Sequence, residues 1–96
     1  RFAGFLPWGG GDWTGLVRVR DGQATAFAPG FGGANGIAWV AARQRLLVSD
    51  FWERRLRWFD PASGDFDGYA TAELPIHPDN LTLDAERGEV LIAGSK

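Results

Sequence analysis

The sequence has no cysteine among its 96 residues. A disulfide, thiol catalysis and a thiolate metal site are therefore all excluded. The apolar runs are far shorter than the ~20 residues that a membrane-spanning helix needs, and no signal-peptide pattern is visible at Arg1. The net charge of −2 offers no basic patch of the kind that binds nucleic acid. These absences argue against a nucleic-acid partner and against a membrane-spanning segment, and they leave the compartment unassigned.

Methionine is also absent, and the chain begins at Arg1. A natural reading frame starts with methionine, so we expect the N-terminus to have been cut away and the chain to be a fragment. A domain of this length leaves much of its surface exposed and is only marginally stable unless something reinforces it.

Glycine and aromatic residues are abundant instead. The chain has 14 Gly, five Trp and seven Phe, a composition that suits short strands joined by tight turns. It does not suit helices, in which each interior Gly costs ~1 kcal/mol relative to Ala. No segment shows the periodicity of an amphipathic helix, so an all-β fold is predicted.

Alternating apolar and polar residues predict about eight short strands, separated by turn signals such as Asp21-Gly22. Residues 1–14 contain Pro7 and a run of three Gly and are expected to form a packed loop. The predicted strands span residues 15–20, 23–28, 36–40, 45–49, 55–59, 66–71, 81–85 and 90–93. A sandwich and a propeller both fit such a series.

An internal repeat favours the propeller. An Asn-led strand, a turn and a return strand occupy residues 35–49 and recur over residues 80–94. Asn35 and Asn80 are 45 positions apart, which matches the period of a four-stranded blade. The chain is therefore predicted to hold about two blades, as segments 15–78 and 79–96 of a partial β-propeller domain over residues 1–96. Two blades cannot close a ring, so a fragment or an assembly of several copies is expected.

The repeated Asn residues are candidate metal ligands. The innermost strand of a blade starts near the central channel, where the corresponding residues of different blades converge. Asn35 and the Asp79-Asn80 pair supply amide and carboxylate oxygens, which calcium takes in sets of six to eight. The alternative is that they only build turns, since Asn-Gly is a common turn dipeptide and Pro-Asp-Asn also fits a turn.

Three stretches carry a family likeness: Ala-Asn-Gly-Ile at 34–37, Leu-Val-Ser-Asp at 47–50 and Asp-Asn-Leu-Thr-Leu-Asp at 79–84. They resemble the paraoxonase/arylesterase family, as do residues 55–59, 87–92 and the hairpin at 15–28. The resemblance implies a six-bladed propeller that hydrolyses lactones or aryl esters, with a calcium ion held in part by Asn35, Asp79 and Asn80. Three parts of the family's site have no counterpart here: its glutamate ligand, its other asparagine ligand and its histidine dyad. We expect these residues to lie upstream of Arg1. No catalytic residue is therefore assigned in this chain.

Other functions fit the same pattern. A propeller can bind a ligand or partner at its rim without catalysis, and gluconolactonase-like and strictosidine-synthase-like propellers share the Asn-Gly-Ile motif. The hydrolase interpretation implies a small-molecule ester or lactone as substrate. Exposed strand edges at both ends predict self-association.

The remaining chemistry-bearing residues have structural interpretations. His77, the only histidine, is predicted to pack within a loop at 74–78 rather than to act as a general base. The charged run at 53–57 is predicted to form a solvated strand face. Trp39, Trp52 and Trp58 are expected to fill space between blades, whereas Trp8 and Trp13 are candidates for a substrate entrance or a membrane-facing lip.

Overall fold

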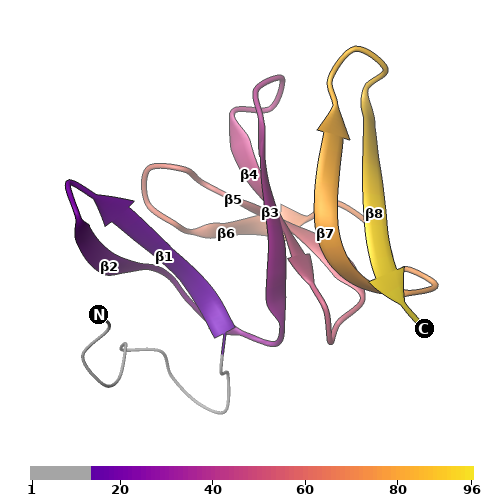
Figure 1. Cartoon of the computed structure of the whole chain (residues 1–96), viewed down its shortest axis with the longest axis horizontal. Coiled ribbons are helices and arrows are strands. Elements are labelled where there is room, and N and C mark those ends of the chain that lie inside the picture. The colour runs from indigo at the N-terminus through magenta and orange to yellow at the C-terminus, as the bar shows by residue number, and fades with distance from the viewer. Residues whose placement is uncertain (1–13) are drawn as a thin grey trace.

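The protein is all-β over residues 14–96, the part of the chain that this computed structural model describes. The predicted loop at 1–14 lies outside this range except for Thr14, which is already in a strand. Eight strands form three antiparallel sheets, in the orders β1–β2, β3–β4–β5–β6 and β7–β8 (Figure 1). Their bounds are β1 Thr14–Arg20, β2 Gln23–Phe31, β3 Ala34–Val40, β4 Arg45–Asp50, β5 Arg55–Phe59, β6 Phe66–Tyr69, β7 His77–Asp84 and β8 Glu89–Ser95. No helix long and apolar enough to cross a membrane occurs within this range.

The turn between β1 and β2 confirms the hairpin predicted from Asp21-Gly22. Both residues have positive φ, 52° for Asp21 and 76° for Gly22, and Arg20 pairs directly with Gln23. Two such residues form the type of turn whose twist matches that of the flanking strands. Gln44 and Gly88 adopt the same left-handed region in the β3–β4 and β7–β8 turns.

β3 begins at Ala34, two residues before the prediction, and β8 ends at Ser95, two residues after it. Three other strand ends also differ from the prediction by two residues or more. β2 continues to Phe31 instead of stopping at Ala28. β7 begins at His77 instead of Leu81, so His77 and Pro78 belong to a strand and not to the expected loop. Proline fits there because the β7–β8 register is irregular between Pro78 and Leu81, where the missing N–H breaks no regular ladder.

The third difference is at β6, which ends at Tyr69 rather than at Thr71. The Thr71 hydroxyl accepts the backbone N–H of Leu56 at 3.2 Å, while the Ala70 N–H donates to the Leu56 carbonyl at 2.8 Å. A side chain thus replaces the backbone partner that a longer β6 would have provided.

The core lies between the β1–β2 sheet and one face of the four-stranded sheet. It consists of Ala28, Phe31, Val48 and Phe59, and the rings of Phe31 and Phe59 stack with centroids 5.2 Å apart. Burying the Phe31, Val48 and Phe59 side chains contributes about 1.5–3 kcal/mol each. This packing attaches the first hairpin to the sheet.

The opposite face of the four-stranded sheet packs on β7–β8. Leu56 and Trp58 face this side, and Trp58 lines the space between the two sheets as expected. Trp39 and Trp52 do not fill such a space, because they are 45% and 68% exposed. Trp8 and Trp13 lie outside the described residues. The space-filling interpretation is thus wrong for two of the three described tryptophans.

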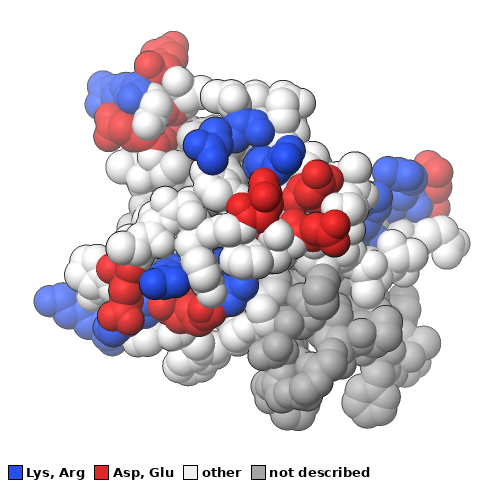
Figure 2. Space-filling model, turned by 180° about the vertical axis from the view of Figure 1, so that it is seen from behind, with Lys and Arg blue, Asp and Glu red and all other residues white. Residues whose placement is uncertain are grey.

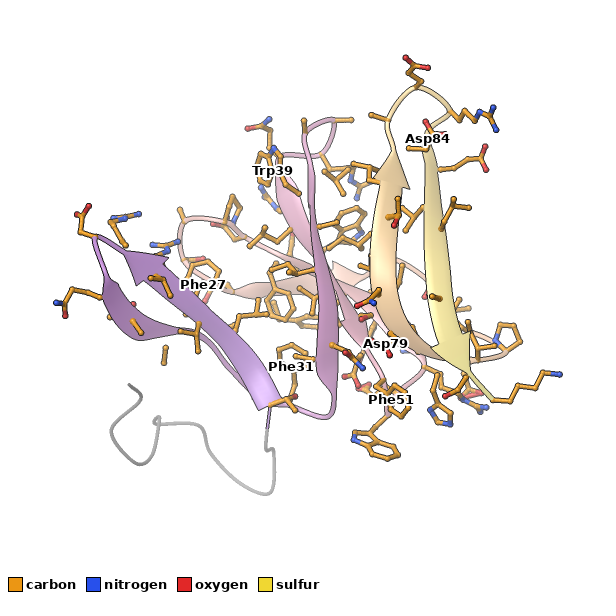
Figure 3. All side chains as sticks on the ribbon, viewed as in Figure 1. Phe27, Phe31, Trp39, Phe51, Asp79 and Asp84 are labelled. Atoms are coloured by element: carbon orange, nitrogen blue, oxygen red, sulfur yellow. The ribbon has the colours of Figure 1, made fainter. Side chains whose placement is uncertain are left out.

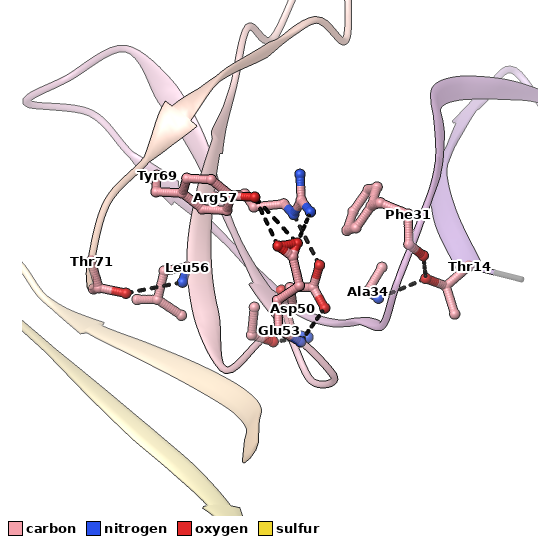
Figure 4. A network of polar contacts seen from close by, with 11 residues as sticks. Thr14, Phe31, Ala34, Asp50, Glu53, Leu56, Arg57, Tyr69 and Thr71 are labelled. Carbon is pink, nitrogen blue, oxygen red and sulfur yellow. Dashed lines mark hydrogen bonds and ion pairs between the residues drawn. The ribbon is translucent and has the colours of Figure 1, made fainter. Parts of the chain in front are cut away.

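A buried ion pair corrects the expectation of a solvated face at 53–57. Asp50 is fully buried, and its carboxylate meets the Arg57 guanidinium at 3.0 Å (Figure 4). Glu53 joins the network by accepting hydrogen bonds from Arg57 and from the Tyr69 hydroxyl. The Arg57 guanidinium also lies over the Phe31 ring. The Arg57 side chain therefore packs inside the protein and does not face solvent, because both faces of β5 are covered.

The turn after β5 depends on Asp60. Hydrogen bonds from the backbone N–H groups of Ser63 and Ala62, together with the nearby Arg45 guanidinium, hold the pKa of Asp60 below its usual range. A carboxylate whose pKa is lowered on folding stabilises the fold above its unfolded pKa of about 3.9, and this contribution is lost as the pH falls through the folded pKa.

We expect the Asp60→Asn variant to melt below the wild type at pH 7, and we expect the difference in Tm to shrink as the pH falls from about 4 through the lowered pKa of Asp60. Asparagine keeps an acceptor oxygen for both N–H groups, so the difference isolates the charge. Thermal unfolding followed by circular dichroism between pH 2 and pH 8 measures it. A gap in Tm that does not change with pH would contradict the role of the ionised carboxylate.

Candidate metal-binding site

The three residues predicted as metal ligands lie on two strands that run side by side, β3 and β7 (Figure 1). Asn35 is near the start of β3, and Asp79 and Asn80 are near the start of β7. Figure 3 labels Asp79. The two backbones touch at Gly36, where an added Cβ would lie 2.4 Å from the Asp79 carbonyl oxygen. Glycine is thus required at position 36, because any side chain would push the strands apart.

Both strands are irregular at the same point. The β3–β4 register shifts between Ala34 and Ile37, and the β7–β8 register shifts between Pro78 and Leu81. Asn35 lies within the first irregularity, and Asp79 and Asn80 lie within the second. Irregularities of this kind re-aim side chains and are common beside functional sites. The sequence repeat therefore corresponds to a repeated break in the ladder.

Ser49 holds the two strand starts together. This side chain is fully buried on β4, where its hydroxyl accepts the Gly36 N–H at 2.6 Å and donates to the Asp79 carbonyl at 2.7 Å. One hydroxyl can do both because it carries one donor and two acceptor lone pairs. Ser49 thus satisfies two backbone groups that the broken ladders leave free.

The candidate ligands themselves are accessible. Asn35 and Asn80 are exposed and Asp79 is half-buried. Within residues 14–96, none of the three side chains forms a hydrogen bond or a salt bridge, and none of these residues has positive φ. The alternative that they build turns is therefore wrong, since all three lie in extended strands.

The donor set is compatible with a hard cation but incomplete. Asn35, Asp79 and Asn80 offer one carboxylate and two amide oxygens, whereas calcium takes six to eight oxygens. The Asp79 carbonyl is already engaged by Ser49. No group of three or more His, Cys, Asp or Glu side chains is placed to hold a metal within the described range. The remaining ligands would have to come from outside residues 14–96.

His77 has a packing role. Its ring stacks on Phe51 with centroids 4.9 Å apart, and its Nδ1 lies 2.7 Å from the Phe51 carbonyl oxygen. Trp52 meets the same ring edge-on. These contacts join the start of β7 to the β4–β5 connection. His77 therefore packs as expected, although it does so from a strand and not from a loop.

Two residues of this region belong to the Leu-Val-Ser-Asp motif at 47–50 but were assigned no role from the sequence. Ser49 and Asp50 follow the apolar run Leu46–Val48, and there they look like the end of an ordinary strand. Apart from the motif, the signal was their position: two polar residues at the end of a strand that is otherwise buried. Ser49 holds the backbone next to the candidate metal ligands in place, whereas Asp50 stabilises the four-stranded sheet through its ion pair with Arg57.

Comparisons with protein-family models, with curated proteins and with solved structures found no match to this chain. The functional argument therefore depends on the residues at the starts of β3 and β7 and on the motif resemblance described above.

Proposed function

We propose that the three sheets are successive parts of a β-propeller. The four-stranded meander β3–β6 has the layout of one complete blade, with β3 innermost. β7–β8 then corresponds to the inner half of the next blade, and β1–β2 to the outer half of the preceding one. The adjacency of β3 and β7 supports this arrangement, because inner strands of neighbouring blades meet around a central axis.

Within such a fold, the chain carries part of the calcium site of a hydrolase that acts on lactones or aryl esters, similar to the paraoxonase/arylesterase family. One observation supports this most: Asn35 and the Asp79-Asn80 pair lie at matching irregularities of two adjacent strands, with the Gly36 and Asp79 backbones in contact. Turn chemistry does not explain this match, since neither segment is a turn.

Asn35 and Asn80 would contribute amide oxygens to the ion, and Asp79 would contribute its carboxylate. A bound calcium ion would polarise the carbonyl group of an ester or lactone and stabilise negative charge on its oxygen. Ser49 fixes the backbone beneath the ligands and so keeps the strand starts at a set separation. No residue within 14–96 is assigned as general base or nucleophile.

Replacing Asp79 by asparagine should weaken calcium binding by at least about tenfold, about 1.4 kcal/mol. The change removes the only carboxylate of the set and keeps the size of the side chain. Isothermal calorimetry with calcium, and with magnesium for comparison, measures the affinity. Asp84→Asn is the matched control, because Asp84 lies at the other end of β7.

Hydrolysis of a lactone and of an aryl ester, followed with and without a chelator, then tests the reaction. Calcium binding by the wild type and Asp84→Asn but not by Asp79→Asn, together with chelator-sensitive hydrolysis, would support both parts of the proposal. Calcium binding without hydrolysis would support the metal site and reject the reaction for this chain. Equal affinities in all three proteins, or no binding at all, would reject the site and favour a propeller that binds a ligand or partner without catalysis.

A further inference from the structure

The start of β3 contains a chemically labile dipeptide, Asn35-Gly36. The backbone nitrogen that follows an asparagine can attack the carbon of the side-chain amide, and glycine obstructs this attack least because it has no side chain. The other asparagine of the chain, Asn80, is followed by Leu81. The leucine side chain obstructs the attacking nitrogen, so Asn35 is the more reactive of the two amides.

The packing of β3 on β7 requires this glycine. A Cβ at position 36 would collide with the Asp79 carbonyl oxygen and would also crowd the backbone of Asn80. Gly36 is buried by this contact, whereas Asn35 is exposed. A bulkier residue that would slow the reaction of Asn35 is therefore excluded at position 36, and the fold has to protect the dipeptide in another way.

The buried hydroxyl of Ser49 engages the nitrogen that would attack. The Gly36 N–H donates to the Ser49 hydroxyl at 2.6 Å, and Ser49 is fully buried. The nitrogen must lose this proton to a base such as hydroxide before it can attack. A hydrogen bond to a buried acceptor holds the proton in place and keeps the base away from it. The same hydroxyl donates to the Asp79 carbonyl at 2.7 Å, which fixes its orientation.

The conformation of the strand adds to this protection. Asn35 lies within β3 and does not have positive φ. Closing a five-membered ring between the Asn35 side chain and the Gly36 nitrogen requires rotation about the Asn35 Cα–C bond, away from the extended conformation. This rotation would carry the Gly36 nitrogen away from Ser49. Ring closure and the hydrogen bond to Ser49 therefore exclude each other.

We infer that Asn35 is a site of spontaneous deamidation and that Ser49 protects it in the folded protein. In this reaction the Gly36 nitrogen loses its proton and bonds to the side-chain carbon of Asn35, and the side-chain nitrogen leaves as ammonia. Water then opens the cyclic imide at either carbonyl, which yields aspartate or isoaspartate. The inference depends on contacts among β3, β4 and β7, and it uses neither the proposed calcium site nor the proposed propeller.

Both products would disturb the start of β3. The aspartate product adds a negative charge to the strand start that packs against Asp79. The isoaspartate product lengthens the main chain beside Gly36, where the two backbones already touch, so the hydrogen bonds to Ser49 cannot both be kept. Deamidation is irreversible, and its rate would therefore limit the lifetime of the folded protein.

An exposed turn of the same chain provides a matched control. Asp21-Gly22 forms the tip of the β1–β2 hairpin, and both residues are exposed. Charged side chains gather at this tip, at one end of the face in Figure 2. Asp21→Asn creates a second Asn-Gly dipeptide there, in a turn that suits it. Nothing lies within 4 Å of a Cβ added at Gly22, so this second dipeptide is open to solvent.

Incubation at mildly alkaline pH, followed by mass spectrometry of proteolytic peptides, measures the rate at each site, because deamidation replaces an NH2 group by OH. In the folded Asp21→Asn variant, Asn35 should react at least about tenfold more slowly than the amide introduced at position 21. In urea the two rates should agree within about threefold, since no opening step then limits either site.

Ser49→Ala should accelerate the reaction of Asn35 at least about tenfold, because it leaves the Gly36 N–H without its buried partner. Gly22→Ala is the control for a general loss of stability, since it strains the β1–β2 turn and leaves the Ser49 hydrogen bonds intact. In this variant the rate at Asn35 should stay within about threefold of the wild type, because local opening and not global unfolding limits the reaction.

Equal rates for the two Asn-Gly dipeptides in the folded Asp21→Asn variant would overturn the inference. This comparison needs no substitution at Ser49, so it tests the protection of Asn35 even if Ser49→Ala fails to fold. A rate at Asn35 that Ser49→Ala leaves unchanged would also overturn the inference. The same holds for a rate that Gly22→Ala raises as much as Ser49→Ala does, because the protection would then come from global stability alone.

Discussion

Replacing Arg57 by methionine is expected to destabilise the protein by about 3–5 kcal/mol, a large part of the stability of a small domain. The Arg57 side chain is 12% exposed and the Asp50 side chain is 0% exposed, so the substitution leaves a buried carboxylate without its counter-ion. The Glu53 N–H, at 3.1 Å from Asp50, is one remaining donor and cannot compensate a full charge. Urea unfolding followed by tryptophan fluorescence measures the loss.

An exposed ion pair between the β4–β5 and β6–β7 connections provides the control. Glu73 meets Arg54 at 3.1 Å, but both side chains are well exposed, and Glu73→Ala should cost less than about 1 kcal/mol. Adding Asp50→Asn to the Arg57→Met variant should recover part of the loss, because a neutral amide replaces the unpaired charge. A loss below about 1 kcal/mol for Arg57→Met would mean that the pair contributes little and that the Phe31 and Phe59 core alone holds the hairpin.

The second large effect is expected for Gly64→Ala, with a destabilisation of about 2–5 kcal/mol. Gly64 has a φ of +78°, and a Cβ added there would lie 2.1 Å from the Phe27 carbonyl oxygen. The alanine variant would therefore carry backbone strain and would also push the β1–β2 hairpin off the turn after β5. Thermal and urea unfolding measure the total.

Gly22 offers a close match for this substitution. Its φ is +76°, yet nothing lies within 4 Å of an added Cβ. Gly22→Ala should therefore show only the backbone strain of about 1–2 kcal/mol, and the difference between the two variants measures the collision with Phe27. Equal losses for Gly64→Ala and Gly22→Ala would show that the hairpin moves aside at no cost.

Strand number and pairing could be predicted because they depend on local patterns. The Asp21-Gly22 turn and the alternation after it specify a hairpin from a few neighbouring residues, and the β1–β2 register agrees. The errors come from contacts between distant segments. Arg57 was predicted to face solvent because the alternation of apolar and charged residues shows only which residues of a strand share a face. It does not show that other parts of the protein cover both faces of β5. Pro78 looked like a loop residue because its strand is irregular just there.

The candidate site was predictable in part for a related reason. A spacing of 45 residues between Asn35 and Asn80 already suggested equivalent positions in successive units, and β3 and β7 do lie side by side. The close approach at Gly36 depends on the path of two backbones that are far apart in sequence, which no local pattern reveals. Ser49 was missed because a buried hydroxyl between two strands looks like any strand residue until its partners are known.

The adjacency of β3 and β7 also has a consequence for the order of folding. Every strand pair in the three sheets joins neighbours in the sequence, so each hairpin can form early, on a timescale of about 1–10 μs. The contact between Gly36 and Asp79 is different, because β4, β5 and β6 all lie between these two residues in the sequence. Forming it closes a much longer segment of chain than forming a hairpin does. Chain entropy delays such a contact until the meander between its ends has formed. The two strand starts should therefore meet last, after the sheet that separates them in sequence is complete.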